Sequence, residues 1–316
     1  MADAEPVPVA HDRLAAGDVP PAPSGALRSG AGWWARAAAS PWVRNRKALA
    51  GVWLTGVFIA VAVLAPLLSP YSPTAMQFAP FASPSAAHPL GTTAAGQDVL
   101  SQLIWGTRTS LLVGFLAGGA STVLSVVIGM LAGYAGGVVD EVLSLVTNVF
   151  LVLPGLPLII VLAAYIPFHG LLPIGLVVAV TGWSFGARVL RSQVLSLRGR
   201  DFVQAARGSG EGTWGVVFGE ILPHMTSLIV SVLLFAVIYA VLSEAGLEFL
   251  GLGNSSLVTW GTILYWADNG QAIVSGSWWW FVPPGLCIGL LGAGLALLNY
   301  AIDEITNPRL AGGGAR

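Results

Sequence analysis

Six long runs of apolar residues constrain this chain more than any other feature of its sequence. An α-helix needs about 20 consecutive apolar residues to cross the hydrocarbon core of a bilayer. The runs cover residues 49–68, 109–133, 142–166, 171–187, 225–243 and 281–302. Hydrophobic residues make up 55% of the chain and charged residues only 9%, whereas soluble domains carry about 25% charged residues. The sequence therefore predicts an all-α integral membrane protein with six transmembrane helices.

The regions outside these runs set the expected domain boundaries. Residues 1–41 are rich in Ala, Pro and Gly without periodicity, which predicts a disordered cytoplasmic tail. The membrane domain is expected over residues 42–310, followed by a short cytoplasmic tail at 311–316. A cleaved signal peptide is a poor interpretation of the first run, since its apolar core exceeds the roughly 7–15 residues of such signals.

The distribution of basic residues predicts the orientation. Arg44, Arg46 and Lys47 precede the first run, and Arg188, Arg191, Arg198, Arg200 and Arg207 surround the loop after the fourth. The segments expected on the other side, 69–107, 167–170 and 245–280, contain no Lys or Arg. Both termini and the loop at 201–224 are therefore expected in the cytoplasm.

The loop at 201–224 is a polar segment, interrupted by glycines, between the fourth and fifth apolar runs. Asp201 is placed to cap a short helix that ends near Arg207, and the glycines at 208, 210 and 212 should interrupt it. Thr213 can cap a second helix that ends near Pro223. Composition leaves two interpretations equally open: a compact knob that binds a partner, with Trp214 filling a groove, or an ordinary loop on the membrane surface.

The spacing within this loop resembles the "EAA…G…I-LP" loop of ABC-importer permeases. The matching residues are Gln204, Ala205, Ala206, Gly210, Ile221, Leu222 and Pro223. In that family the loop forms the coupling helix, which docks in a cleft of the ATPase subunit. The resemblance thus implies an ATPase-coupling surface formed by Gln204, Ala205, Ala206, Gly210, Trp214, Leu222 and Pro223.

Four further motifs resemble the C-type permease subunits of the dipeptide, oligopeptide and nickel importers. They lie, in family order, at residues 88–101, 133–140, 243–261 and 307–310. The resemblance implies the type I ABC importer permease fold in the plasma membrane of a prokaryote. It also implies four kinds of partner: a second, B-type permease, two ATP-binding subunits, an extracytoplasmic solute-binding protein and the lipid bilayer.

The chain departs from the family pattern at several positions. Gln204 stands where the family has Glu, which replaces an ionic contact by a neutral hydrogen bond. Leu145 and Asn148 stand where the third helix of relatives carries Arg and Asp. Losing both charges together is physically coherent, because a lone charge inside the membrane is costly. Glu211 and Glu220 are further departures within the loop, which could tune the match to a particular ATPase.

No catalytic site is expected in this chain. Lys47 is its only lysine, and it has no G-x-x-x-x-G-K-[ST] phosphate loop. Its four histidines lie far apart, which argues against a metal site. We therefore expect a transport subunit that binds no cofactor and no nucleic acid, with ATP and Mg²⁺ held by the partner ATPase.

Few ionisable residues fall within the apolar runs. Glu244, together with Trp260, could line an outer vestibule or a subunit interface, or Glu244 could be a charge at a helix end. Asp303 and Glu304 are interpreted mainly as solvated charges. Because proton-coupled carriers usually contain acids or histidines inside the membrane, a secondary carrier or channel that needs no ATPase is the less favoured alternative.

The substrate is the weakest inference from the sequence. The resemblance favours import of short peptides, with this chain forming half of the translocation pore. A largely uncharged pore also suits a neutral oligosaccharide such as cellobiose, which remains the alternative substrate for the same machinery.

Overall fold

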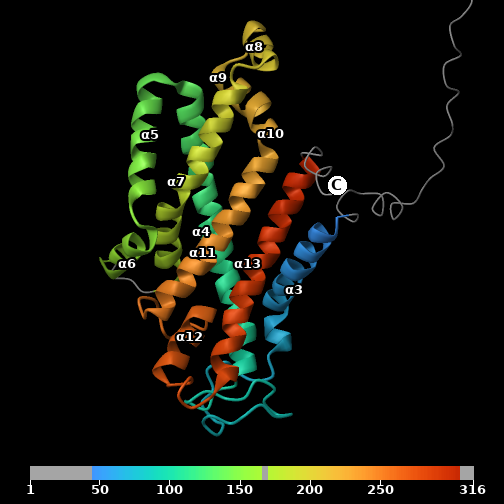
Figure 1. Ribbon diagram of the computed structural model, residues 1–316, viewed down its shortest axis with the longest axis vertical. Helices are drawn as coiled ribbons and strands as arrows, with labels where there is room; N and C mark the ends of the chain where they lie inside the picture. The colour runs from blue at the N-terminus through green and yellow to red at the C-terminus, as the bar shows by residue number, and fades with distance from the viewer. Residues whose placement is uncertain (1–44, 166–169, 307–316) are drawn as a thin grey trace, which may run out of the picture. The chain divides into compact units, whose positions relative to one another are not determined.

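The computed structural model describes residues 45–165 and 170–306, which belong to one compact unit (Figure 1). Every regular element in these residues is helical, and the only strand-like contact among them is an isolated bridge between Thr92 and Asp98. The elements are α3 (Arg46–Leu68), α4 (Val99–Ala135), α5 (Gly137–Val152), α6 (Gly155–Tyr165), α7 (Leu171–Leu197), α8 (Asp201–Gly208), α9 (Thr213–Gly215), the π-helical turn η1 (Val216–Ile221), α10 (Leu222–His224), α11 (Thr226–Phe249), α12 (Trp260–Asn269) and α13 (Trp278–Thr306). The expected tails, 1–41 and 311–316, and the motif at 307–310 lie outside the described residues.

Within the described ranges, five helices are long and apolar enough to cross a bilayer: α3, α4, α7, α11 and α13. The bent pair α5 and α6 supplies a sixth if the two count as one span. This agrees with the predicted all-α membrane fold. The helix α4 begins at Val99, ten residues before the expected span at 109–133, because Asp98 caps it by accepting a hydrogen bond from the backbone N of Ser101 at 2.8 Å.

The third expected span, 142–166, is not one straight helix. Its two parts, α5 and α6, differ in direction by 94°. Pro154 accounts for the break, since proline lacks a backbone N–H and disfavours the helical conformation in the residue before it. Leu153 is accordingly extended, with φ −67° and ψ 132°.

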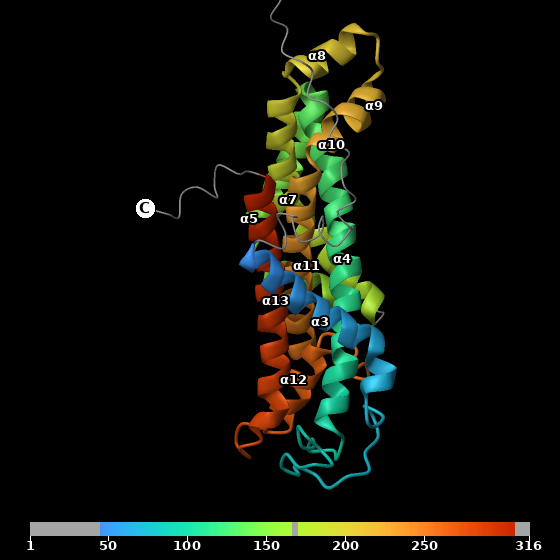
Figure 2. The same cartoon turned by 90° about the vertical axis from the view of Figure 1, so that its right-hand side faces the viewer.

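The helix α4 packs against α3, α5, α7 and α11. Figure 2 shows α3 running obliquely across the helices behind it, where it contacts α4 and α13. Small residues permit the close contacts of α4: Gly118 faces Val237 of α11, and Gly129 and Gly133 face Leu190 and Val194 of α7. Without a hydrophobic drive between helices in lipid, such close backbone approach supplies much of the association energy.

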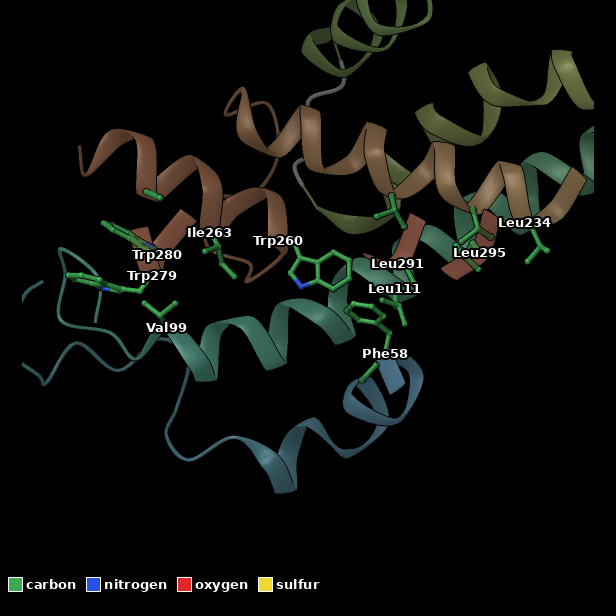
Figure 3. Close-up of a cluster of buried hydrophobic side chains, with 14 of the residues drawn as sticks. Phe58, Val99, Leu111, Leu234, Trp260, Ile263, Trp279, Trp280, Leu291 and Leu295 are labelled. Carbon is green, nitrogen blue, oxygen red and sulfur yellow. The ribbon is translucent and has the colours of Figure 1, made fainter. Parts of the chain in front are cut away.

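A cluster of buried apolar side chains joins α3, α4, α11, α12 and α13 (Figure 3). Trp260 of α12 is fully buried and meets Phe58 of α3 edge to face, with ring centroids 5.6 Å apart. Leu111 of α4 and Leu291 of α13 belong to the same cluster. The cluster therefore fixes α12, a helix that the sequence analysis did not predict, against four long helices.

Hydrogen bonds fix the segment between α3 and α4 against neighbouring helices. His88 Nδ1 lies 2.9 Å from Asp98 Oδ1, and the indole N–H of Trp279 donates to the carbonyl of Thr92 at 3.3 Å. Gly91 and Gly96 have positive φ angles of 63° and 69°, which favour glycine. The residues of the 88–101 motif thus tie this segment to the beginnings of α4 and α13.

The close approach of α4 to α11 is testable at Gly118. A Cβ atom there would lie 2.7 Å from the backbone N and 2.8 Å from the Cα of Val237. We expect Gly118→Ala to lower the unfolding temperature of the purified protein, with overpacking costing about 1–3 kcal/mol. At the neighbouring Gly119 a Cβ would meet nothing within 4 Å, so Gly119→Ala should leave that temperature unchanged or raise it. Equal unfolding temperatures for the two variants would contradict this contact.

Candidate functional site

The loop that joins α7 to α11 consists of α8, α9, η1 and α10, and it is called the 201–224 loop below. Figure 1 shows it at the end of the bundle opposite α12. Two helical segments meet at residues 209–212, as the sequence predicted. Each helical segment was predicted to have its cap at Asp201 or Thr213. In the structure the cap positions lie one residue earlier, at Arg200 and Gly212. Asp201 lies in the first turn of α8, where a negative charge stabilises the helix by its favourable interaction with the helix dipole.

One face of the 201–224 loop is buried against the bundle. Val203, Val216, Val217 and Ile221 form an apolar cluster with residues of α4, α7 and α11. The partners from those three helices are Met130, Leu190, Val194, Leu197 and Val232. Ala206 is half-buried on the same cluster. The loop is therefore a packed part of the bundle rather than a free connector.

Polar contacts add to this attachment. The guanidinium of Arg207 lies over the ring of Tyr134 on α4, 5.0 Å from its centroid. Arg198 Nη1 donates to the carbonyl of Gly133 at 3.1 Å. Cation–π contacts of this kind contribute about 0.5–1 kcal/mol where exposed. Both contacts join the chain around α8 to the end of α4.

The opposite face of the loop is exposed. Gln204, Ala205, Gly210, Trp214 and Pro223 are exposed, and Leu222 is half-buried. The Trp214 side chain is 66% exposed and stacks on Phe218, which is 55% exposed, with centroids 5.7 Å apart. Phe218 was missed by the sequence analysis, although its four-residue spacing from Trp214 is the spacing of neighbours on one helix face. An exposed stacked aromatic pair is typical of a surface that binds another protein.

Gly210 gives the loop its shape. Its φ of 86° places it in the left-handed region. Its N–H donates to the carbonyl of Arg207 at 3.0 Å, and the N–H of Glu211 donates to the carbonyl of Ala206 at 3.1 Å. These two bonds form a Schellman motif, which ends α8 and usually requires glycine at the left-handed position. The glycine of the sequence motif is thus explained by the turn between the two helical segments.

Substitution of Gly210 tests the role of this turn. A side chain costs roughly 1–2 kcal/mol in the left-handed conformation, so Gly210→Ala should loosen the loop and raise hydrogen exchange across 201–224. Gly208 lies in the last turn of α8, and a Cβ there would meet nothing within 4 Å. Gly208→Ala is therefore the matched control and should leave exchange unchanged or slow it. The account of the turn fails if both variants exchange at the wild-type rate.

Two side-chain contacts join α5 to α7 at the same end of the bundle. Arg191 binds Asp140 through two hydrogen bonds of 2.5 and 2.7 Å. Arg188 donates to Asn148 Oδ1. Asn148 is one of the two departures from the family pattern that the sequence analysis places in the third span, and its amide oxygen accepts this bond from the α7 arginine. Leu145, the other position, is exposed.

Glu244 and Trp260 were expected at a vestibule or a subunit interface. The structure instead places both side chains inside the chain, each with 0% of its surface exposed. Ser110 Oγ donates to Glu244 Oε2 at 3.3 Å, and it accepts from the backbone N of Trp260 at 3.1 Å. The beginning of α12 therefore covers Glu244, which explains why a residue near the end of α11 is not at the surface.

A cavity of about 590 Å³ lies between the helices of the bundle and is called the middle cavity below. Its walls come from α4, α5, α6, α7, α11 and α13, and the sequence analysis did not identify it. Its polar lining residues are Ser125, Thr181, Ser184, Ser231, Tyr239, Asn299 and Asp303. Polar side chains within membrane spans usually face such interior spaces.

A second cavity, of about 610 Å³, lies at the α12 end. It is lined by the segment before α4, by α12 and the loop that precedes it, and by single residues of α4 and α13; no Asp, Glu, Lys or Arg is among the described lining residues. Across residues 45–165 and 170–306 there is no group of three His, Cys, Asp or Glu side chains placed to hold a metal ion.

Comparison with known proteins gives two family matches. Residues 125–312, which include the 201–224 loop and the whole lining of the middle cavity, match the family described as "binding-protein-dependent transport system inner membrane component". Residues 33–88 match the "N-terminal TM domain of oligopeptide transport permease C".

Individual relatives extend over most of the chain. The dipeptide transport system permease protein DppC of Bacillus subtilis is 32% identical over 270 residues, which covers 84% of this chain and 83% of the relative. The oligopeptide transport system permease protein OppC of the same organism is 31% identical over 270 residues, covering 84% and 87%. OppC of Mycobacterium bovis is 33% identical over 268 residues, covering 80% and 89%.

These matches, together with the spans in the described residues, establish the family and the fold. The chain belongs to the family of binding-protein-dependent transport system inner membrane components, as a DppC/OppC-like membrane permease subunit of the ABC-importer type with the type I permease fold.

Proposed function

We propose that this chain forms half of the translocation pore of an ATP-driven importer of short peptides, and that residues 204–223 receive the motion of the ATPase. The two faces of the 201–224 loop carry the proposal. One face is packed on α4, α7 and α11, and the other exposes Trp214 and Phe218 to a partner. The names of the relatives, which are dipeptide and oligopeptide permeases, support the substrate class.

The proposed mechanism is mechanical. Closure of the ATP-binding subunits would press on the exposed face of the loop. Because the buried face packs on α4, α7 and α11, the loop and these helix ends would move together. Packed helices respond to such a displacement by rigid-body rotation or shear, which is how alternating access arises.

Four partners complete this proposal. A second permease of matching fold would form the other half of the pore, two ATP-binding subunits would hold ATP and Mg²⁺, and an extracytoplasmic protein would deliver the solute. Basic residues lie near the loop and around the beginning of α3. They favour placing the loop and both termini on the cytoplasmic side of a prokaryotic inner membrane. The absence of a phosphate loop from the sequence supports the assignment of ATP hydrolysis to a partner.

The oligosaccharide alternative is favoured by one observation. The cavity at the α12 end has uncharged walls that combine Trp266 and Trp280 with the amides of Gln97, Gln102 and Asn269. Such walls suit a neutral, hydroxyl-rich solute.

Uptake of a dipeptide and of cellobiose by the assembled transporter, each measured with and without ATP, separates the two substrates. ATP-independent uptake would instead favour a secondary carrier.

Substitution of Trp214 tests the coupling proposal. We expect Trp214→Ala to weaken association with the ATP-binding subunits by about 2 kcal/mol or more, the usual cost of removing an aromatic residue at the centre of an interface. The association is measured by co-purification of the subunits at increasing dilution. The unfolding temperature of the isolated chain should hardly change, because the Trp214 side chain is mostly exposed.

Trp53 provides the matched control. It lies on α3 and is 67% exposed, almost the same as Trp214. Trp53→Ala removes an equally exposed indole far along the sequence from the loop, and it should leave co-purification intact. If Trp214→Ala and the double variant Trp214→Ala/Phe218→Ala both co-purify like the wild type, the loop is not the docking surface.

A further inference from the structure

Among the residues that the structure describes, one acidic side chain lines the middle cavity. It belongs to Asp303 on α13, and the described part of the lining includes no Glu, Lys or Arg. The sequence suggested a solvated charge with no further role for this residue. The side chain is indeed exposed, yet it also lines the cavity, so it lies at the edge between the cavity and the surroundings of the chain.

Asn299 lies one helical turn before Asp303, and both line the cavity. Residues with this spacing have Cβ atoms about 5–6 Å apart on one helix face. Asn299 is only 6% exposed, and its Oδ1 atom has no hydrogen-bond partner within the described part of the chain. A buried carbonyl oxygen without a partner is costly, and here it borders an open space large enough for a ligand.

Ser231 of α11 adds a third oxygen to this group. It is buried, lines the cavity, and donates a hydrogen bond to Asp303 Oδ1 over 3.5 Å. A hydroxyl that donates one bond still has lone pairs to accept others. Two neighbouring helices therefore present a carboxylate, an amide oxygen and a hydroxyl to one region of the cavity.

We propose that Asp303, Asn299 and Ser231 form a binding subsite for a primary ammonium group on the transported solute. An ammonium group has three N–H donors and a positive charge, which match three oxygen acceptors of which one is a carboxylate. This inference rests on the proposed function, because the α-amino group of a short peptide is such an ammonium group. It adds to that function a contact inside the permease that distinguishes a peptide from a neutral sugar.

The remaining walls suit the rest of a short peptide. Phe150, Phe185 and Phe235 supply apolar surface, and Thr181 and Ser184 supply hydroxyl groups. The described residues of these walls include no other Asp, Glu, Lys or Arg, so they select no particular peptide side chain by charge. The volume of about 590 Å³ falls within the range of about 300–1,000 Å³ typical of small-ligand sites. The subsite thus recognises a feature common to peptides of different sequence.

The test uses the complete transporter in liposomes, with its binding protein and ATP, and measures uptake of a dipeptide that has a free amino terminus. We expect Asp303→Asn to lower uptake at a subsaturating dipeptide concentration about tenfold, because the ammonium group then faces a neutral amide oxygen in place of a carboxylate. Asp303→Glu, which keeps the charge, should retain most of the uptake. Asn299→Leu, which removes an acceptor but no charge, should also lower it severalfold.

Glu304→Gln is the matched control. Glu304 is the next residue on α13, and its carboxylate binds Asn45 and lies 3.8 Å from Lys47 rather than lining the cavity. This variant should transport the dipeptide within about twofold of the wild type, since exposed ion pairs contribute little. Co-purification of all subunits and the unfolding temperature are measured for each variant, so that a loss of assembly is not taken for a loss of binding.

The outcomes separate this inference from the proposed function. If the wild type takes up the dipeptide with ATP while Asp303→Asn and Asn299→Leu match it, the subsite is wrong and the importer remains. If the wild type takes up cellobiose but no dipeptide, both the peptide assignment and the subsite are wrong. If Asp303→Asn fails to assemble, dipeptide uptake by Asn299→Leu is compared with the wild type instead, and equal uptake again means that the subsite is wrong.

Discussion

The packing of the 201–224 loop against the ends of α4, α7 and α11 is the contact on which the rest of the account depends. Val203, Val216 and Ile221 are buried there with residues of all three long helices. Close-packed interiors transmit displacement instead of absorbing it. A force on the exposed face of the loop is therefore expected to move these helix ends as a unit, whereas a loosely attached loop would only bend.

The same helices connect the loop to the middle cavity. Both α7 and α11 contribute to the buried cluster beneath the loop and to the cavity wall, and α4 adds Met130 to the cluster and Ser125 to the wall. The glycines of α4 keep its backbone close to both neighbours. A shift of α7 relative to α11 would therefore alter the cavity directly, which would link the loop proposed to receive the ATPase motion to the space proposed to hold the solute.

The sequence predicted the features that depend on local chain properties. In lipid the backbone must satisfy its own hydrogen bonds, so long apolar runs become helices. In the loop, Gly210 marked the turn after α8. Pro154 itself was a local signal for the break between α5 and α6. It was overlooked because the apolar run around it is long enough to predict one continuous span. The burial of Glu244 under α12 and the meeting of Ser231 with Asp303 were not predictable, because they join residues distant in the sequence. The capping box of Thr259 and Thr262 was a signal for α12 that could have been read.

The central claim is that the 201–224 loop is the surface through which this chain receives work. The most direct measurement places a photo-crosslinking residue at single positions in the assembled transporter. Positions 205 and 214 on the exposed face of the loop are compared with position 141, near the turn between α4 and α5. The account predicts cross-links from the loop to the ATP-binding subunits, with yields that change when ATP is added. Cross-links from position 141 with none from the loop would contradict it.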